Sequence, residues 1–240
     1  MLVNYQPIVD IQTRKIVKAE ALCRFPESPP GLDNPDDFIK YAERHGIIKG
    51  LTEWLLGTTF EYWKTLGPLA PPELAINLSV QNLLEVDLAD RVLAALKQHK
   101  LEPSQLCLEI DERLLDLHDN SVHANINKLK AKGVSLAIDG FGPSLSPVSH
   151  LEISSLGITE LKLDRVMLSN LDENAKNRAS MKTIQEIAFD GKIDLAAKGI
   201  ESEATVEWLV RYGFSRMQGY LIAPPLSPED FSAWLKANPA

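Results

Sequence analysis

The sequence predicts a single α/β domain whose strands close into a barrel. From Leu74 onward, short apolar runs alternate with helical patterns, which is typical of a parallel sheet. The length of 240 residues suits one barrel and does not require a second domain. The chain also lacks the G-x-G-x-x-G and G-x-x-x-x-G-K motifs with which an open doubly wound sheet binds phosphate. These observations favour the closed barrel.

Each predicted element follows from its local pattern, and the number of strands suits a closed eight-stranded barrel. The strands are the apolar runs at residues 5–10, 17–22, 74–77, 106–110, 134–139, 161–164, 193–198 and 217–220. Helical patterns occupy residues 88–99, 122–132, 175–189 and 203–212. Gly133 is a typical residue to end the second of these helices. The proline-rich stretches at 26–35 and 68–72 are predicted to be loops.

Composition narrows the class of protein. Hydrophobic residues make up 45% and charged residues 24%, as in ordinary globular proteins. A net charge of −8 argues against binding duplex nucleic acid through a basic surface. No apolar run approaches a membrane span, and residues 1–4 lack the features of a signal peptide, so we expect a cytoplasmic protein without membrane insertion. Cys23 and Cys107 lie far apart and are expected to be buried thiols.

Polar residues recur at or near the ends of the predicted strands, where a barrel places its active-site mouth. They are Glu20, Asn77, Glu109, Asp139, Lys162, Lys198 and Gln218. The first four offer three carboxylates and one amide oxygen, a donor set that selects Mg²⁺ or Mn²⁺. Such an ion activates water for phosphodiester hydrolysis, and Lys162 could offset the phosphate charge. The alternative is that each acid caps a helix or pairs with a nearby base.

Several motifs, in order along the chain, are similar to those of one family. They are Tyr5-Gln6-Pro7, Glu20-Ala21-Leu22, Asn77-Leu78-Ser79, Leu108-Glu109-Ile110-Asp111-Glu112, Asp139-Gly140-Phe141-Gly142, Leu161-Lys162-Leu163-Asp164 and Gln218-Gly219-Tyr220. The chain thereby resembles the bacterial EAL domain, whose members bind cyclic di-GMP and often hydrolyse it to the linear dinucleotide. The resemblance runs from about residue 5 to 234. It implies one domain over residues 1–240, a modified TIM (β/α)8 barrel whose first strand is antiparallel to the rest.

The resemblance also implies a role for individual residues. Glu20, Asn77, Glu109 and Asp139 match the ligands of the first metal ion, which would be Mg²⁺ or Mn²⁺. Glu20, Lys162 and Glu201 match catalytic positions. Glu112 matches an acid that braces the loop after Asp139. The positions that match contacts to the cyclic dinucleotide are Gln6, Arg24, Asn77, Asp139 and Gln218.

The chain departs from the family pattern at two positions that matter for hydrolysis. Active members carry Asp at the position of Gly140 and Glu at the position of Lys198, and both acids serve the second metal ion and its water. Two further departures are the loop at 143–148 and Pro224, which stands where an Arg is usual. Lys198 either replaces the attraction of the second cation for phosphate or turns into solvent. Both alternatives predict weak or absent turnover.

The leading hypothesis from the sequence is a catalytically impaired EAL domain that acts as a cyclic di-GMP receptor. One alternative is a slow phosphodiesterase that works with a single metal ion. Another is a protein-interaction domain that binds no nucleotide. A protein partner and a homodimer are expectations from the family, and the chain is either a stand-alone protein or part of a longer one.

Overall fold

Eight strands close into a barrel in sequence order, as predicted. The computed structural model describes residues 1–240 except 27–33, 118, 142–152, 154, 164–174 and 240. The strands are β1 (Leu2–Asp10), β2 (Ile16–Arg24), β3 (Glu73–Leu78), β4 (Leu106–Asp111), β5 (Ser135–Asp139), β6 (Glu160–Leu163), β7 (Asp194–Ala197) and β8 (Arg216–Gln218). β1 pairs antiparallel with both β2 and β8, whereas the other neighbours pair parallel. The expected antiparallel first strand is therefore confirmed.

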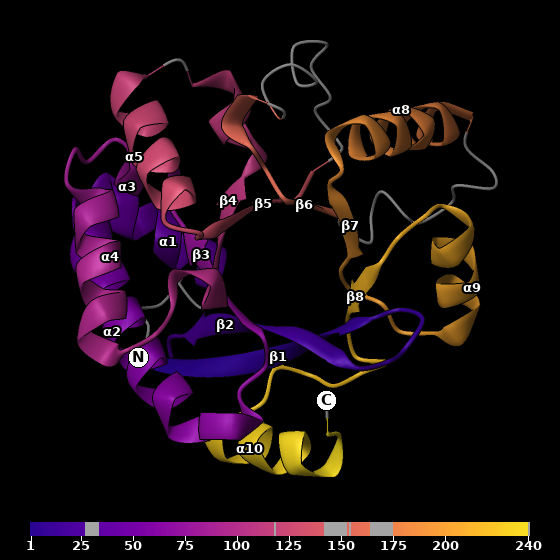
Figure 1. Ribbon diagram of the computed structural model, residues 1–240, viewed down its shortest axis with the longest axis horizontal. Helices are drawn as coiled ribbons and strands as arrows, with labels where there is room; N and C mark the ends of the chain where they lie inside the picture. The colour runs from indigo at the N-terminus through magenta and orange to yellow at the C-terminus, as the bar shows by residue number, and fades with distance from the viewer. Residues whose placement is uncertain (27–33, 118, 142–152, 154, 164–174, 240) are drawn as a thin grey trace.

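Helices surround the ring of strands in Figure 1. They are α1 (Pro35–Arg44), α2 (Ile48–Leu66), α3 (Val80–Leu83), α4 (Leu88–His99), α5 (Asn120–Ala131), α8 (Ala175–Gly191), α9 (Glu203–Arg211) and α10 (Pro228–Ala237). The four predicted helices correspond to α4, α5, α8 and α9, with small differences at their ends. Short 3₁₀ turns η1 (Gly67–Leu69), η2 (Pro103–Gln105) and η3 (Glu112–Asp116) complete the described elements.

The sequence prediction missed α1, α2, α10 and the four-residue α3. Pro35 and Pro228 occupy the first turns of α1 and α10, where a proline loses no helical hydrogen bond, so they mark helix starts. The predicted loop at 26–35 is wrong at its end, because Asn34 caps α1 by accepting a 3.1 Å hydrogen bond from the Asp36 amide. In α2 the buried face includes Thr52, whose hydroxyl donates to Asn82 Oδ1 at 2.9 Å. Such polar core positions weaken an apolar pattern.

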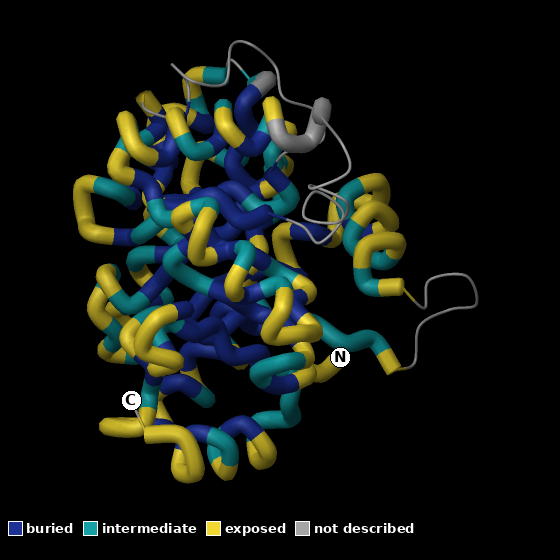
Figure 2. Tube along the Cα trace, turned by 90° about the vertical axis from the view of Figure 1, so that its right-hand side faces the viewer, coloured by how far each residue is buried: buried dark blue, intermediate teal, exposed yellow. Residues whose placement is uncertain are grey.

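The two faces of the strands differ in chemistry. Outward-facing residues such as Ile76, Leu108 and Ile138 are fully buried against the helices. Figure 2 shows the buried residues gathered in the interior and the exposed ones on the outer surfaces of the helices. Alternation along the strands turns the neighbouring residues toward the barrel axis. Ala75 and Cys107 lie together in this inner space, which is polar at both of its ends.

Charged residues fill the barrel at the amino ends of the strands. The buried Lys18 Nζ lies 3.1 Å from Glu160 Oε2 and 3.4 Å from Glu73 Oε2. Arg216 pairs with the same Glu160 and, at 2.7 Å, with Asp194. Residues at this end of a barrel generally serve stability, whereas the opposite end holds the functional loops. The candidate site is therefore sought at the carboxyl ends.

The two cysteines differ in how far they are buried. Cys107 is fully buried as expected, and burial raises its pKa to about 12. Cys23 is only partly buried, so the prediction of a buried thiol is wrong there, because this residue lies near the mouth end of β2.

Among the described residues, none of the helices has the length and apolar character needed to cross a membrane.

Candidate functional site

The carboxyl ends of the strands bring the predicted site residues to one end of the barrel. Asn77 and Glu109 sit opposite each other in the β3–β4 pairing, and Asp139 sits opposite Lys162 in the β5–β6 pairing. Glu20 contacts this group from β2, and Gln218 reaches it from the last position of β8. Parallel strands with side chains alternating across the sheet account for this convergence. The roles of the individual residues remain predictions.

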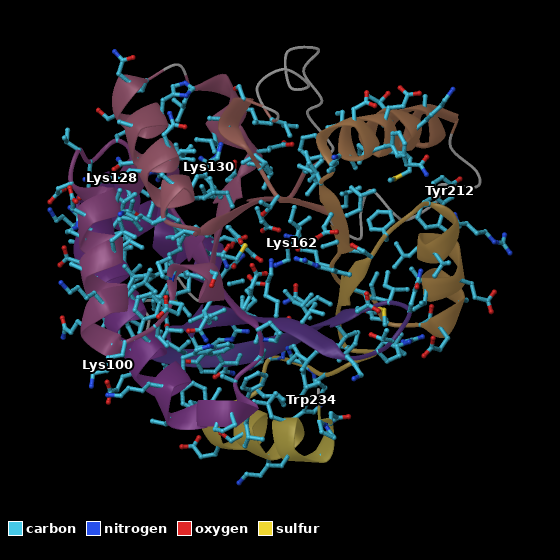
Figure 3. All side chains as sticks on the ribbon, in the orientation of Figure 1. Lys100, Lys128, Lys130, Lys162, Tyr212 and Trp234 are labelled. Atoms are coloured by element: carbon cyan, nitrogen blue, oxygen red, sulfur yellow. The ribbon has the colours of Figure 1, made fainter. Side chains whose placement is uncertain are left out.

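Lys162 joins two buried carboxylates near the middle of the barrel (Figure 3). Its Nζ donates to Glu20 Oε2 at 2.6 Å and to Glu109 Oε2 at 2.7 Å. Burial alone would lower the pKa of Lys162, but the negative charges of Glu109 and Glu20 outweigh burial and raise the pKa well above its usual value. Lys162 is therefore a permanent cation at this position.

Glu20 is held in its ionised form by several donors. Burial would raise its pKa, but Lys162 and the hydrogen bonds to Glu20 lower that pKa to about 2. Besides Lys162, the Asn77 amide donates to Oε1 at 2.7 Å and Gln218 Nε2 donates to Oε2 at 2.8 Å. Gln218 also donates to Gln6 Oε1 at 3.0 Å. Gln6 is therefore linked to Glu20 through Gln218.

Glu109 accepts fewer hydrogen bonds than Glu20 does. Its Oε1 is buried without a hydrogen-bond partner among the described residues. Burial and the neighbouring charge of Glu20 raise the pKa of Glu109 to about 8, even though Lys162 opposes the shift. The two carboxylates thus differ because Glu20 accepts three side-chain hydrogen bonds and Glu109 accepts one.

The raised pKa of Glu109 predicts a pH dependence of stability. Between about pH 5 and pH 8 the folded protein keeps a proton that the unfolded chain releases, so the free energy of unfolding falls as pH rises. The slope for one proton is at most about 1.4 kcal/mol per pH unit. Glu109→Gln should remove this component, as measured by urea unfolding across that range. Glu229→Gln, at an exposed residue of α10, is the control and should keep the wild-type slope; equal slopes in all three proteins would contradict the prediction.

Lys198 points into the site rather than into solvent. Its Nζ lies 2.9 Å from Asp139 Oδ1 and 3.0 Å from Oδ2, and the two side chains are 27% and 24% exposed. The alternative in which Lys198 turns into solvent is therefore wrong. Gly140 follows Asp139 with a φ of +70° and adds no side chain to the site. Asp139 thus contacts an ammonium group where the family pattern predicts additional acids.

The remaining predicted residues lie around this centre. The Arg24 Nη1 donates to the Cys23 carbonyl oxygen at 2.9 Å, and Arg24 lines the main cavity. Glu201 is exposed and lines a smaller cavity. Glu112 begins η3 and is half-buried, whereas most of the loop that it was predicted to brace, together with the departure at 143–148, lies outside the described residues. Pro224 is exposed.

Two cavities open at this end of the barrel, with volumes of about 680 and 310 Å³. Glu20, Leu22 and Lys198 line both. The larger cavity also reaches Lys40 and Arg113, which sequence reasoning missed. Arg113 stands in the turn after β4, and such turns face the mouth of a barrel, so its position was available as a signal. Lys40 gave no such signal because α1 itself was not predicted.

A metal ion requires carboxylate oxygens that are available to it. The donor chemistry of Glu20, Asn77, Glu109 and Asp139 suits a hard cation. In the structure, however, Glu109 Oε1 is the only oxygen of the three carboxylates without a partner among the described residues. Within those residues, no three His, Cys, Asp or Glu side chains are arranged to hold a metal. As arranged, the site therefore does not fit the predicted Mg²⁺ or Mn²⁺.

Comparison with known proteins decides the family. A model of the EAL domain matches residues 1–225. The chain belongs to the EAL-domain family. This EAL domain is 31% identical, over 97% of its residues, to the bifunctional diguanylate cyclase/cyclic di-GMP phosphodiesterase MucR of Pseudomonas aeruginosa, and it covers 34% of that protein. It is 32% identical, over 98% of its residues, to the probable cyclic di-GMP phosphodiesterase PdeI of Escherichia coli, of which it covers 30%.

Solved structures agree with the fold. The MucR phosphodiesterase in complex with c-di-GMP superposes with a TM-score of 0.86 at 31% identity, covering 96% of this chain and 93% of that one. The FimX EAL domain from Pseudomonas aeruginosa bound to c-di-GMP gives a TM-score of 0.80 at 21% identity, covering 94% and 90%, and supports the fold alone. The EAL domain spans about a third of the length of the first curated relatives.

Proposed function

We propose that this EAL domain is a receptor that binds cyclic di-GMP and hydrolyses it weakly or not at all. The observation that carries the proposal is the contact between Lys198 and Asp139, beside the missing side chain of Gly140. The relatives supply the ligand class, because MucR and PdeI are named as cyclic di-GMP phosphodiesterases.

The main cavity suits an anionic ligand of this size. Its volume of about 680 Å³ lies within the range of small-molecule sites, roughly 300–1,000 Å³. Four basic residues line it, Arg24, Lys40, Arg113 and Lys198, together with six acidic ones, Glu20, Asp36, Glu43, Glu109, Asp111 and Asp139. These cations can neutralise the two phosphates of a cyclic dinucleotide without a metal ion. Ligand binding thus has support from the volume of the cavity and from its four basic residues, which must offset the acidic residues of the same lining.

Hydrolysis has less support. The chemistry expected of the family needs a metal-bound water, and Gly140 has no donor atom to offer a second ion. Lys198 carries a positive charge, so it repels a cation and cannot act as a ligand. Lys162 and Lys198 contact the three carboxyl groups, and the raised pKa of Glu109 keeps a proton on that group near neutral pH, so little negative charge is left for a divalent ion. This environment attracts divalent ions weakly.

One observation favours the alternative of a slow phosphodiesterase. Glu109 Oε1 lacks a hydrogen-bond partner among the described residues, so no donor occupies this oxygen. A single ion could therefore bind near Glu109. Chromatography for the linear dinucleotide, with Mn²⁺ present, separates the alternatives. Metal-dependent product above that of a Glu20→Ala variant would favour the enzyme.

Calorimetric titration with cyclic di-GMP tests the receptor function. We expect binding both with Mg²⁺ and in chelated buffer. Arg24→Ala should weaken binding by about tenfold or more, because a hydrogen bond to a charged group contributes roughly 1.5–3 kcal/mol. Arg14→Ala is the matched control, since Arg14 pairs with Glu203 and does not line either cavity. An absence of binding at high micromolar nucleotide in both buffers would reject the proposal and leave the protein-interaction alternative.

A further inference from the structure

We infer that Lys198 is a built-in counter-ion that excludes divalent metal from Asp139 and supplies positive charge to the ligand cavity in its place. This inference rests on the proposed function for the ligand, but the metal exclusion stands on the geometry of the unliganded site. In a metal-loaded site, the positive charge beside the ligand comes from bound ions. Here the positive charge beside Asp139 comes from Lys198, a residue of the chain itself.

The backbone fixes the direction of the Lys198 side chain. The Lys198 amide donates to the Leu163 carbonyl at 3.0 Å, which extends the β6–β7 ladder by one residue beyond β7. Gly199 then turns the chain with a φ of +73°, and the Ile200 amide donates to the Gln218 carbonyl at 3.0 Å. Side chains alternate along a strand, so residue 198 faces the same way as Ala196, which is buried. The inward direction is therefore built into the sheet.

The contact with Asp139 uses both oxygens of the carboxylate. The distances of 2.9 and 3.0 Å place the ammonium between Oδ1 and Oδ2. A cation that binds Asp139 must either displace Lys198 or share the carboxylate with it. Displacement leaves an ammonium group without this partner, and sharing places two positive charges within a few ångströms. Both raise the free energy of metal binding.

The rest of the site reinforces this exclusion. Lys162 occupies one oxygen of Glu20 and one of Glu109, so each of the three carboxylates contacts a lysine. Lys198 also lines both cavities, whereas Lys162 is buried beneath them. Of the two lysines, Lys198 is thus placed to meet a phosphate that enters the mouth. A point charge of this kind attracts phosphate but generates no hydroxide.

The competition between Lys198 and metal must be reciprocal. If Lys198 lowers the affinity of the site for a cation by some factor, the cation weakens the Lys198–Asp139 pair by the same factor. Removing the ammonium while keeping the aliphatic stem should therefore increase metal affinity without adding a ligand. Lys198→Met makes this change, and Lys198→Gln is a second variant that keeps a polar end.

Binding of MnCl₂ alone, measured by electron paramagnetic resonance without nucleotide, tests the inference. We expect both Lys198 variants to bind Mn²⁺ about tenfold or more tightly than the wild type. Lys49→Met is the control, because Lys49 pairs with Glu85 and Asp87, lines neither cavity and should leave Mn²⁺ affinity unchanged. Equal Mn²⁺ affinity in the wild type and in the Lys198 variants would overturn the inference.

A second measurement tests the supply of charge to the ligand. In chelated buffer, Lys198→Met should lose about tenfold in affinity for cyclic di-GMP, and Mn²⁺ should restore part of it. Undiminished affinity in that variant would overturn this half. If no protein binds the nucleotide, the proposed function fails, whereas the Mn²⁺ comparison still decides whether Lys198 excludes metal.

Discussion

Gly140→Asp combined with Lys198→Glu is expected to convert this EAL domain into a metal-dependent cyclic di-GMP phosphodiesterase. The double change restores the two acids of the family pattern and removes the ammonium from Asp139. The rate of linear dinucleotide formation with Mn²⁺ should rise by about 100-fold or more, the scale on which single electrostatic groups act at active sites. Chromatography of the reaction beside the parent protein measures it.

The local backbone permits the Asp at position 140. A Cβ built on Gly140 has no heavy atom of the described residues within 4 Å, apart from its chain neighbours, so the side chain meets open space there. The φ of +70° is left-handed, and Asp is one of the residues that adopt this conformation more readily than most. We expect a cost of about 1–2 kcal/mol in stability, which leaves the protein folded.

The Glu at position 198 gives the experiment an internal control. Without metal it adds a negative charge beside Asp139, so the melting temperature of the double variant should fall below that of the parent. Mn²⁺ should raise that temperature in the double variant more than in the parent, because a cation then relieves the repulsion. If the double variant responds to Mn²⁺ but remains inert, the metal site is not what limits hydrolysis, and a further defect must lie elsewhere in the chain.

Lys162→Met is expected to lower the free energy of unfolding more than the substitutions at Gly140, Lys198 or Glu109 do. The lysine is buried between Glu20 and Glu109, and its removal leaves two buried carboxylates without a cation. Breaking a buried ion pair by removing one partner costs roughly 3–5 kcal/mol. Urea unfolding near neutral pH measures the loss as a lower midpoint.

Two comparison variants make this result specific. Lys182→Met removes a lysine that pairs with Glu186 at 3.9 Å on the surface of α8, and it should change the free energy of unfolding by less than about 1 kcal/mol. Adding Glu20→Gln to Lys162→Met should recover part of the loss, because Glu20 is the ionised carboxylate that loses its cation, whereas Glu109 keeps its proton near neutral pH. A loss for Lys162→Met no larger than that for Lys182→Met would show that Lys162 is not needed to neutralise the pair.

The sequence by itself determined the strand order and the end of the barrel that carries the site. Apolar runs of strand length, interrupted by helical patterns, have few compact arrangements, and a parallel barrel is one of them. Within that fold, polar residues at successive strand ends such as Asn77, Glu109 and Asp139 must face the same mouth. The family motifs added the antiparallel first strand. The helix α1 escaped prediction because its first residue belongs to the proline-rich stretch 26–35, which was interpreted as a loop, and polar residues such as Thr52 interrupt the buried face of α2. The start signal of α10, Pro228, was overlooked.

Only the tertiary structure decided what the charged side chains do to one another. The local sequence allows Lys198 to face either solvent or the site. In the structure its amide hydrogen-bonds to Leu163 in the sheet and its ammonium group contacts Asp139, so its side chain points into the barrel mouth. Likewise, Glu20 and Glu109 look alike in sequence. Their pKa values move in opposite directions because burial acts on both, whereas the stabilising hydrogen bonds gather on Glu20. Charge pairing depends on distances between strands far apart in the chain, and those distances exist only in the closed barrel.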